Sequence, residues 1–331
     1  MVKLALLGWG KESPIIYQTI QEQLKGVQLI GVSSGDEEVL QKLRSSSEIK
    51  LVERDYRRLL GFHDLDGVII PSGNDRSMSK VVESFEAGKN VLMCNPIATN
   101  VSEAMTIKAK ADQYTTQYAT AALPRRYDAN ILKVISLLKK GAIGEISSIR
   151  TNAIVEREEI KLTNSKNIRA GLYMDSMVND IDMIHFITDE VFVDVHARGS
   201  VRRFDDLAKF KDIDTAMVSG QLSNGIRVQM QCLVSEIAGP EFQVEIEGSQ
   251  GRISFFNESW SKEIRIQGKK DVRIVRTPQG NSPFYNIIHE FAHSVLMKKL
   301  PADTITPAIQ NIKTAVAFSK SDILKEEVEL S

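Results

Sequence analysis

Over the first 120 residues, short apolar runs alternate with segments of helical periodicity. The apolar runs have the length and bounding turns of buried strands and lie at Val2–Leu7, Val27–Val32, Gly67–Ile70 and Val91–Cys94. The helical segments lie between and after them, at Pro14–Leu24, Glu37–Arg44 and Met78–Ala87. Because strands separated by helices are joined by right-handed crossovers, this order predicts a doubly wound α/β domain with a parallel sheet over residues 1–121.

After about residue 125 the pattern becomes one of strands that follow each other directly. A helix is predicted at Asn130–Lys140 and a strand at Glu145–Val155. Further strands are predicted at Val191–Ala197, Thr215–Leu222, Arg227–Val234, Phe242–Glu247, Gly251–Phe256, Ile264–Gln267 and Val272–Arg276. Asn224-Gly225 between two of these strands is a strong hairpin signal. We therefore predict a second, α+β domain over residues 122–331 with a large, mostly antiparallel open sheet.

Two helical segments close the chain, at Pro283–Lys299 and Thr306–Ser319. The last helix is a candidate to pack back on the first domain. Along 215–222, Ala216, Val218 and Leu222 alternate with more polar residues, so one face of the sheet is distinctly more apolar. Since large apolar faces rarely stay exposed on a monomer, we predict a homodimer or homotetramer packed through this sheet.

Composition narrows the class of protein. The chain has 331 residues, 42% apolar and 26% charged, with a formal net charge of -1. A near-neutral chain gives no electrostatic reason to expect nucleic acid, and no apolar run approaches the roughly 20 residues that span a bilayer. Cys94 and Cys232 show no metal-ligand spacing and are interpreted as free thiols, so we expect a cytoplasmic protein without a metal site.

A glycine-rich turn follows the first predicted strand and opens a helix. In a G-x-G-x-x-G fingerprint the first Gly makes the turn, the second lets backbone approach a pyrophosphate, and the third permits close packing. Gly8 and Gly10 fit, and Ser13 is small enough for the third place and is also a candidate N-cap. Trp9, Lys11 and the acidic Glu12 fill the remaining places. The turn predicts a binding site for NAD or NADP.

The residues at the end of the second strand do not decide between these cofactors. An acidic residue there usually binds the ribose, but Ser33-Ser34-Gly35 stands in its place and Asp36 follows two residues after Ser34. Serine at this point suits a 2′-phosphate, yet we find no Arg near it in the sequence. We take Ser34 as a cofactor-binding candidate and leave the preference open.

Several segments together resemble the glucose–fructose oxidoreductase / inositol dehydrogenase (Gfo/Idh/MocA) family. DLDGVIIPSGNDRSMSKVVESFEAGKNVLMCNPIATN (64–100) is similar to the second half of the family's Rossmann domain, which closes on an E-K-P motif. GAIGEISSI (141–149), 214–231 and IEGSQGRISF (246–255) resemble further family motifs in the same order. The resemblance implies an N-terminal NAD(P)-binding Rossmann domain and a C-terminal substrate domain. It also implies that Ser72, Gly73 and Asn74 lie beside the nicotinamide ribose, next to Asn95 and Pro96.

The resemblance places substrate residues in 169–186, which we expect to form one amphipathic helix. Asp175 and Asn179 match the family's Asp and His, and Asn95 stands where the family has the Lys of E-K-P. An amide can orient a hydroxyl but cannot exchange a proton at neutral pH, and losing a general acid or base typically costs about 10²–10⁴ in rate. We therefore expect an altered proton relay. Its candidate groups are Asp175, Tyr173, Arg126 and Tyr285 with His289.

Two functions follow from these observations. The first is an NAD(P)-dependent oxidoreductase acting on a sugar, polyol or related small carbonyl compound, with Asp175, Asn179, Asn95 and Tyr173 in catalysis. Its substrate would contact Arg126, Asp175, Asn179 and Tyr285. The alternative is a non-catalytic member of the same family that senses a nucleotide or sugar.

Overall fold

The computed structural model describes residues 1–45, 49–72, 78–157, 171–237, 239–256, 263–278, 280–299 and 301–330. These residues form two compact units. The first unit contains residues 1–124 and 281–312, and the second contains the described residues of 125–157, 171–280 and 313–330.

The sheet of the first unit is parallel throughout, as the sequence predicts. Its strand order is β3-β2-β1-β4-β5-β6, so the chain starts in the middle and reverses direction between β1 and β4. The strands are β1 (Val2–Leu7), β2 (Val27–Ser33), β3 (Leu51–Glu53), β4 (Gly67–Ile70), β5 (Asn90–Cys94) and β6 (Ala119–Ala122). Every residue of β4 is buried, which explains its unbroken apolar sequence.

The helices of the first unit lie between the strands, with one exception. They are α1 (Ser13–Glu22), α2 (Glu37–Ser45), α3 (Tyr56–Leu60), α4 (Met78–Glu86), α5 (Val101–Gln113) and α10 (Pro283–Met297). Helix α10 comes from the far end of the chain and packs against α1 and β1. Its buried Phe291 comes within 3.2 Å of the place where a Cβ on Gly67 would lie. The residues after 280 therefore contribute to the core of the first unit.

The second unit contains a nine-stranded sheet in the order β14-β13-β12-β11-β7-β10-β9-β8-β15. Its strands are β7 (Ile146–Glu156), β8 (Phe192–Ser200), β9 (Thr215–Leu222), β10 (Arg227–Ser235), β11 (Glu241–Gly248), β12 (Gly251–Phe256), β13 (Glu263–Gly268), β14 (Val272–Arg276) and β15 (Val328–Glu329). Neighbouring strands are antiparallel except for β7 and β10, which are parallel. The predicted fold class is confirmed.

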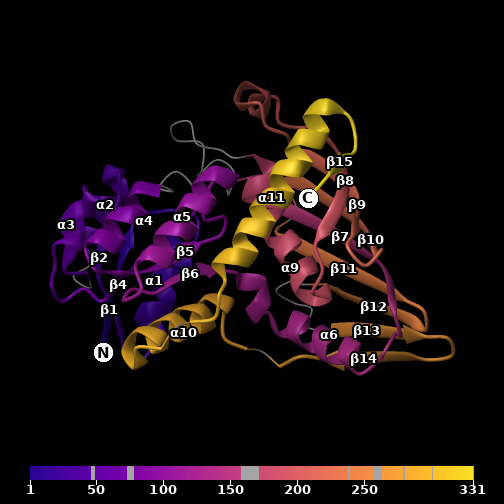
Figure 1. Cartoon of the computed structure of the whole chain (residues 1–331), viewed down its shortest axis with the longest axis horizontal. Coiled ribbons are helices and arrows are strands. Elements are labelled where there is room, and N and C mark those ends of the chain that lie inside the picture. The colour runs from indigo at the N-terminus through magenta and orange to yellow at the C-terminus, as the bar shows by residue number, and fades with distance from the viewer. Residues whose placement is uncertain are drawn as a thin grey trace. The chain divides into compact units, whose positions relative to one another are not determined.

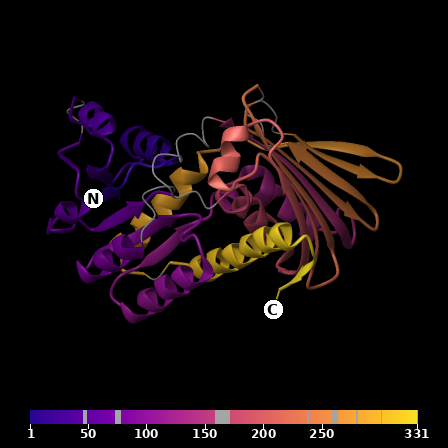
Figure 2. The same ribbon diagram turned by 90° about the horizontal axis from the view of Figure 1, so that it is seen from above.

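One face of this sheet is covered by helices of the same chain. Helices α6 (Ala129–Lys139) and α9 (Val178–Thr188) lie on it, with the C-terminal part of α11 (Ile305–Leu324) (Figure 1). The sheet is seen nearly edge-on in Figure 2, with these helices on one side. Short helical segments lie at Pro124–Tyr127 (η1), Leu172–Asp175 (α8) and Asp205–Phe210 (η2).

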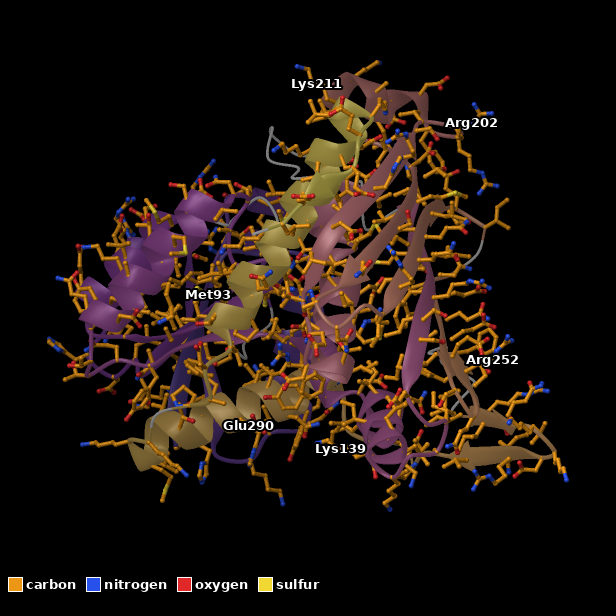
Figure 3. The ribbon with its side chains drawn as sticks, turned by 45° about the vertical axis from the view of Figure 1, so that its right-hand side comes forward. Met93, Lys139, Arg202, Lys211, Arg252 and Glu290 are labelled. Carbon is orange, nitrogen blue, oxygen red and sulfur yellow. The ribbon has the colours of Figure 1, made fainter. Side chains whose placement is uncertain are left out.

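The apolar face that we expected to find exposed is the covered one. Ala216, Val218 and Leu222 of β9 are buried, whereas Met217 and Ser219 point outward. The outer face carries the charged side chains of Arg150, Glu245, Glu247 and Arg252, of which Arg252 is labelled in Figure 3. A cavity of about 340 Å³ lies on this face. The argument for an assembly through an exposed apolar face is therefore wrong, because the chain's own helices bury that face. The homo-oligomer itself stays a prediction.

Candidate functional site

The glycine turn lies at the carboxyl end of β1, where β1 and β4 are neighbours. Gly8 has φ 125°, a conformation that favours glycine. At Gly10 a Cβ would lie 2.1 Å from the carbonyl oxygen of Ser72, which follows β4 by two residues. No side chain fits at Gly10 without displacing that backbone. The turn is therefore pressed against the end of β4.

Ser13 closes this turn, although not as an N-cap. It is the first residue of α1 and is fully buried. Its hydroxyl accepts a hydrogen bond from the backbone N–H of Gly10 at 2.9 Å, and its own N–H donates to the Gly10 carbonyl at 3.1 Å. The predicted capping role of Ser13 is thus replaced by bonds back into the turn, and the N-cap position belongs to Glu12. Pro14 occupies the first turn of the helix as expected.

Glu12, the acidic residue of the turn, is bound at the end of β4. One carboxylate oxygen accepts a hydrogen bond from the Ser72 backbone N–H at 3.1 Å, and the other accepts one from the Ser72 hydroxyl. The 60 residues between these partners explain why the sequence did not reveal the link. A carboxylate held by two donors is fixed in direction, so its charge is turned toward β4.

The other residues of the turn lie at its surface. Trp9 is half-buried with its ring centroid 6.4 Å from that of Tyr17 on α1, and Lys11 is exposed. At the end of β2, Ser34 is buried and its hydroxyl accepts a hydrogen bond from the Asp36 N–H at 3.1 Å. Asp36 itself accepts the backbone N–H of Glu38 at 2.9 Å, so it caps α2.

The third edge of the predicted cofactor site is formed by the residues after β4 and β5. Asn95 and Pro96 are buried directly after β5, whose Met93 is labelled in Figure 3, and the Asn95–Pro96 peptide bond is cis. Burial and then the nearby charge of Glu12 raise the pKa of the Cys94 thiol, so this cysteine stays protonated. Gly73 and Asn74 lie outside the described residues.

These features fit a bound dinucleotide. The turn contains a glycine of positive φ (Gly8), a glycine with no room for a side chain (Gly10) and a small third residue (Ser13). It opens α1 at the β1–β4 switch point, where doubly wound folds bind nucleotides. The N-terminus of α1 would hold the pyrophosphate. Trp9 and Lys11 belong to this turn, and Ser34 and Ser72 follow β2 and β4 in the same unit.

In the second unit, the segment expected as one helix is broken in two. Helix α8 ends at Asp175 and α9 begins at Val178, so the break falls between Asp175 and Asn179. Asp175 and Asn179 are half-buried, and the Asp175 N–H donates to the Gly171 carbonyl at 2.8 Å. The break leaves these two side chains on separate helices.

Tyr173 faces the interior of the second unit. It is 6% exposed and its ring packs edge-on against Phe318 of α11 at 6.1 Å. Burial and then the carboxylate of Asp322 raise the pKa of Tyr173. A phenol that holds its proton so firmly is a poor acid, so this environment favours a packing role over the proton transfer that we predicted for Tyr173.

Arg126 is engaged by a carboxylate of α9. Its guanidinium donates to both carboxylate oxygens of Asp182, from Nε to Oδ2 at 3.0 Å and to Oδ1 at 3.2 Å, and from Nη2 to Oδ1 at 2.8 Å. Its Cζ lies 4.9 Å from the centre of the Phe186 ring. Beside it, Arg125 donates one hydrogen bond to Asp180 at 3.0 Å. Arg126, predicted to bind substrate, therefore has a structural partner that the sequence did not reveal.

Helix α10 carries a row of rings at four-residue spacing. Tyr285 and His289 stack with their centroids 6.1 Å apart, and His289 and His293 follow at 6.4 Å. His289 to His293 spell H-E-x-x-H, a zinc-binding pattern when a third ligand is near. Across the described ranges, no group of three metal-ligating side chains is found.

The predicted site residues thus belong to two units. The first contains Gly8 to Ser13, Ser34, Ser72, Asn95, Pro96 and Tyr285, and the second contains Arg126, Tyr173, Asp175 and Asn179.

Residues 2–121 match the oxidoreductase family with an NAD-binding Rossmann fold. Residues 131–254 match the GFO/IDH/MocA C-terminal domain. The chain belongs to the GFO/IDH/MocA family. The resemblance read from the sequence is confirmed.

Known dehydrogenases are similar to this chain over most of its length. A myo-inositol 2-dehydrogenase of Thermotoga maritima is 23% identical over 258 residues, which cover 76% of this chain and 74% of that protein. The structure of a myo-inositol 2-dehydrogenase from Lactobacillus plantarum superposes with a TM-score of 0.87 at 18% identity, covering 100% of this chain and 99% of that one.

A second structure, of scyllo-inositol dehydrogenase from Lactobacillus casei with bound NAD(H) and scyllo-inositol, gives a TM-score of 0.84 at 21% identity over 99% of both chains. At these identities the structural likeness establishes the shared fold.

Among the helices that the structure describes, none is long and apolar enough to cross a membrane.

Proposed function

We propose that this GFO/IDH/MocA protein is an NAD(P)-dependent oxidoreductase that acts on an inositol, a sugar or a related polyol or carbonyl compound through an altered proton relay. The observation that carries the proposal is the Gly8–Ser13 turn, closed against Ser72 at the β1–β4 switch point. The substrate class is taken from the similar inositol dehydrogenases.

In this proposal the chain's residues bind the cofactor, orient the substrate and transfer protons to or from it. The N-terminus of α1 holds the pyrophosphate, and the nicotinamide supplies or accepts the hydride. Asn95 and Asn179 orient substrate hydroxyls with their amides, which neither gain nor lose protons at neutral pH. Asp175 is the proton-handling group, because it alone remains of the family's Lys–Asp–His set.

The test begins with binding. The purified chain is titrated with NADH and NADPH by fluorescence, and we expect a Kd in the micromolar range, about -8 kcal/mol, for at least one of them. A screen of inositols, sugars and polyols, followed by the absorbance of the reduced nicotinamide, then identifies the substrate. No binding of either cofactor at millimolar concentration would overturn the proposal.

The second candidate, a non-catalytic sensor, is favoured by the environments of the replacement groups. Both family proton donors are Asn here, Tyr173 is buried with a raised pKa, and Arg126 is bound to Asp182. A sensor predicts cofactor binding together with a change in stability when a sugar binds, but no turnover with any compound of the screen. Turnover of one substrate would exclude it.

A further inference from the structure

A fixed carboxylate lies at the switch point of the first unit, in the turn that we propose binds the cofactor. We propose that Glu12 biases this site toward the oxidised, positively charged nicotinamide and so makes the reduced cofactor bound there a stronger hydride donor. The inference rests on the proposed function, since it needs a bound nicotinamide dinucleotide.

The direction of the dinucleotide follows from the sheet. In doubly wound folds the ribose of the adenosine half is read at the end of the second strand, and the pyrophosphate rests on the first helix. With the adenosine half over β2 and the pyrophosphate at α1, the nicotinamide half would lie toward the carboxyl ends of β4 and β5. Strand β5 ends at Cys94, and Ser72 follows the end of β4 by two residues.

The charge of Glu12 lies on that half of the site. Its carboxylate binds the N–H and hydroxyl of Ser72, and it is close enough to Cys94 to help raise the pKa of the thiol. The thiol and the Asn95 amide are neutral. Lys80 of α4 places its ammonium on the carbonyl of Leu7 at 3.0 Å, and this opposing charge is unchanged by any substitution of Glu12.

The redox step changes the charge of the ring by one unit. A hydride, two electrons with one proton, passes from the reduced ring to the carbonyl carbon of the substrate, and the substrate oxygen takes a proton from the protein or water to give an alcohol. The ring that remains carries one positive charge. A nearby carboxylate stabilises this form relative to the neutral reduced ring, because opposite charges attract strongly where water is partly excluded.

The prediction is a ratio of dissociation constants. In Glu12→Gln, which keeps the size of the side chain and removes its charge, the Kd of the oxidised cofactor divided by that of the reduced cofactor should rise about tenfold, equivalent to about 1.4 kcal/mol. Reduced cofactor is titrated by fluorescence and oxidised cofactor by calorimetry. Neither measurement depends on turnover.

Two controls separate charge from structure. Glu38→Gln removes an equal charge from the first turn of α2, on the adenosine side, and should leave the ratio unchanged. Ser72→Ala removes the hydroxyl that binds Glu12 but keeps the carboxylate, so it should shift both dissociation constants together. Thermal melting of each variant shows that the first unit is folded.

The outcomes are distinct. A ratio in Glu12→Gln within about twofold of the unsubstituted protein, with both cofactor forms binding, would overturn the inference and leave the proposed function standing. Failure of the unsubstituted protein to bind either form would instead overturn the proposed function. If Glu12→Gln does not fold, Glu12→Met serves as the neutral variant for the same ratio.

Discussion

Breaking the ion pair between Arg126 and Asp182 tests whether Arg126 stabilises the fold of the second unit or is available to bind substrate. The Asp182 side chain is 1% exposed and the Arg126 side chain 20% exposed. We choose Asp182→Asn, which keeps the shape of the side chain, removes its charge and replaces one of the two acceptor oxygens by an NH2 group that cannot accept a hydrogen bond.

The expected cost follows from the burial of the pair. Removing one partner of a fully buried ion pair typically costs about 3–5 kcal/mol. Because the Arg126 guanidinium keeps some access to water, we expect about 2–3 kcal/mol here. For a unit of this size each kcal/mol lowers the midpoint by roughly 2–4 °C, so the melting temperature of the second unit should fall by about 5–10 °C.

The neighbouring pair is a matched control. Arg125 makes one hydrogen bond to Asp180, with side chains 23% and 5% exposed, so Asp180→Asn should cost about half as much. The double variant Arg126→Met with Asp182→Leu should recover part of the loss, since it leaves no unpaired charge.

The assay is differential scanning calorimetry, which resolves the transitions of a two-unit chain where a single two-state fit does not apply. An Asp182→Asn protein that melts within about 1 °C of the unsubstituted one would refute the structural role. Arg126 would then be available to bind substrate, and the same variant should change KM.

Four further predictions concern other parts of the chain. Gly10→Ala should abolish cofactor binding in a fluorescence titration, because the added Cβ would lie 2.1 Å from the Ser72 carbonyl oxygen. The control Gly35→Ala, whose Cβ would have no atom within 4 Å, should bind the cofactor normally, and equal binding by both variants would contradict the prediction. Asp175→Asn should lower turnover on the identified substrate about 10²-fold or more with cofactor affinity intact, and undiminished turnover would remove Asp175 from the relay. Burial raises the pKa of Asp214, but three backbone N–H groups and the Thr215 hydroxyl outweigh it and hold the pKa below its usual value. This stabilisation is present at neutral pH and is lost as the pH falls through the folded pKa, so the loss of melting temperature in Asp214→Asn should be largest near pH 7 and should shrink as the pH is lowered. Light scattering should report a dimer or tetramer, and a 37.0 kDa monomer at micromolar concentration would exclude that assembly.

Sequence patterns determined most elements, because each is encoded by its own residues. Continuous apolar runs located β1, β2, β4 and β5, and the period-two alternation located the strands from β9 to β14 within one residue at each end. Strand β8 extends three residues beyond its predicted end. Helix α5 was missed although Asn100 accepts the N–H of Glu103, a capping pattern visible in the sequence. Strands β3 and β6 have only three and four residues, too few to show a period.

Only the tertiary structure shows which polar groups form hydrogen bonds or ion pairs with one another. Glu12 meets Ser72 across 60 residues and Arg126 meets Asp182 across 56, and neither pairing leaves a local pattern because folding, not chain proximity, brings the partners together. The same holds for the sheet of the second unit, whose alternation shows that one face is apolar but not that the chain's own helices cover it. The sequence by itself therefore determined the family, most of the strands and the position of the glycine turn. Which carboxylate is bound, which face is buried and which phenol is enclosed depend on contacts between distant segments, and only the folded chain defines them.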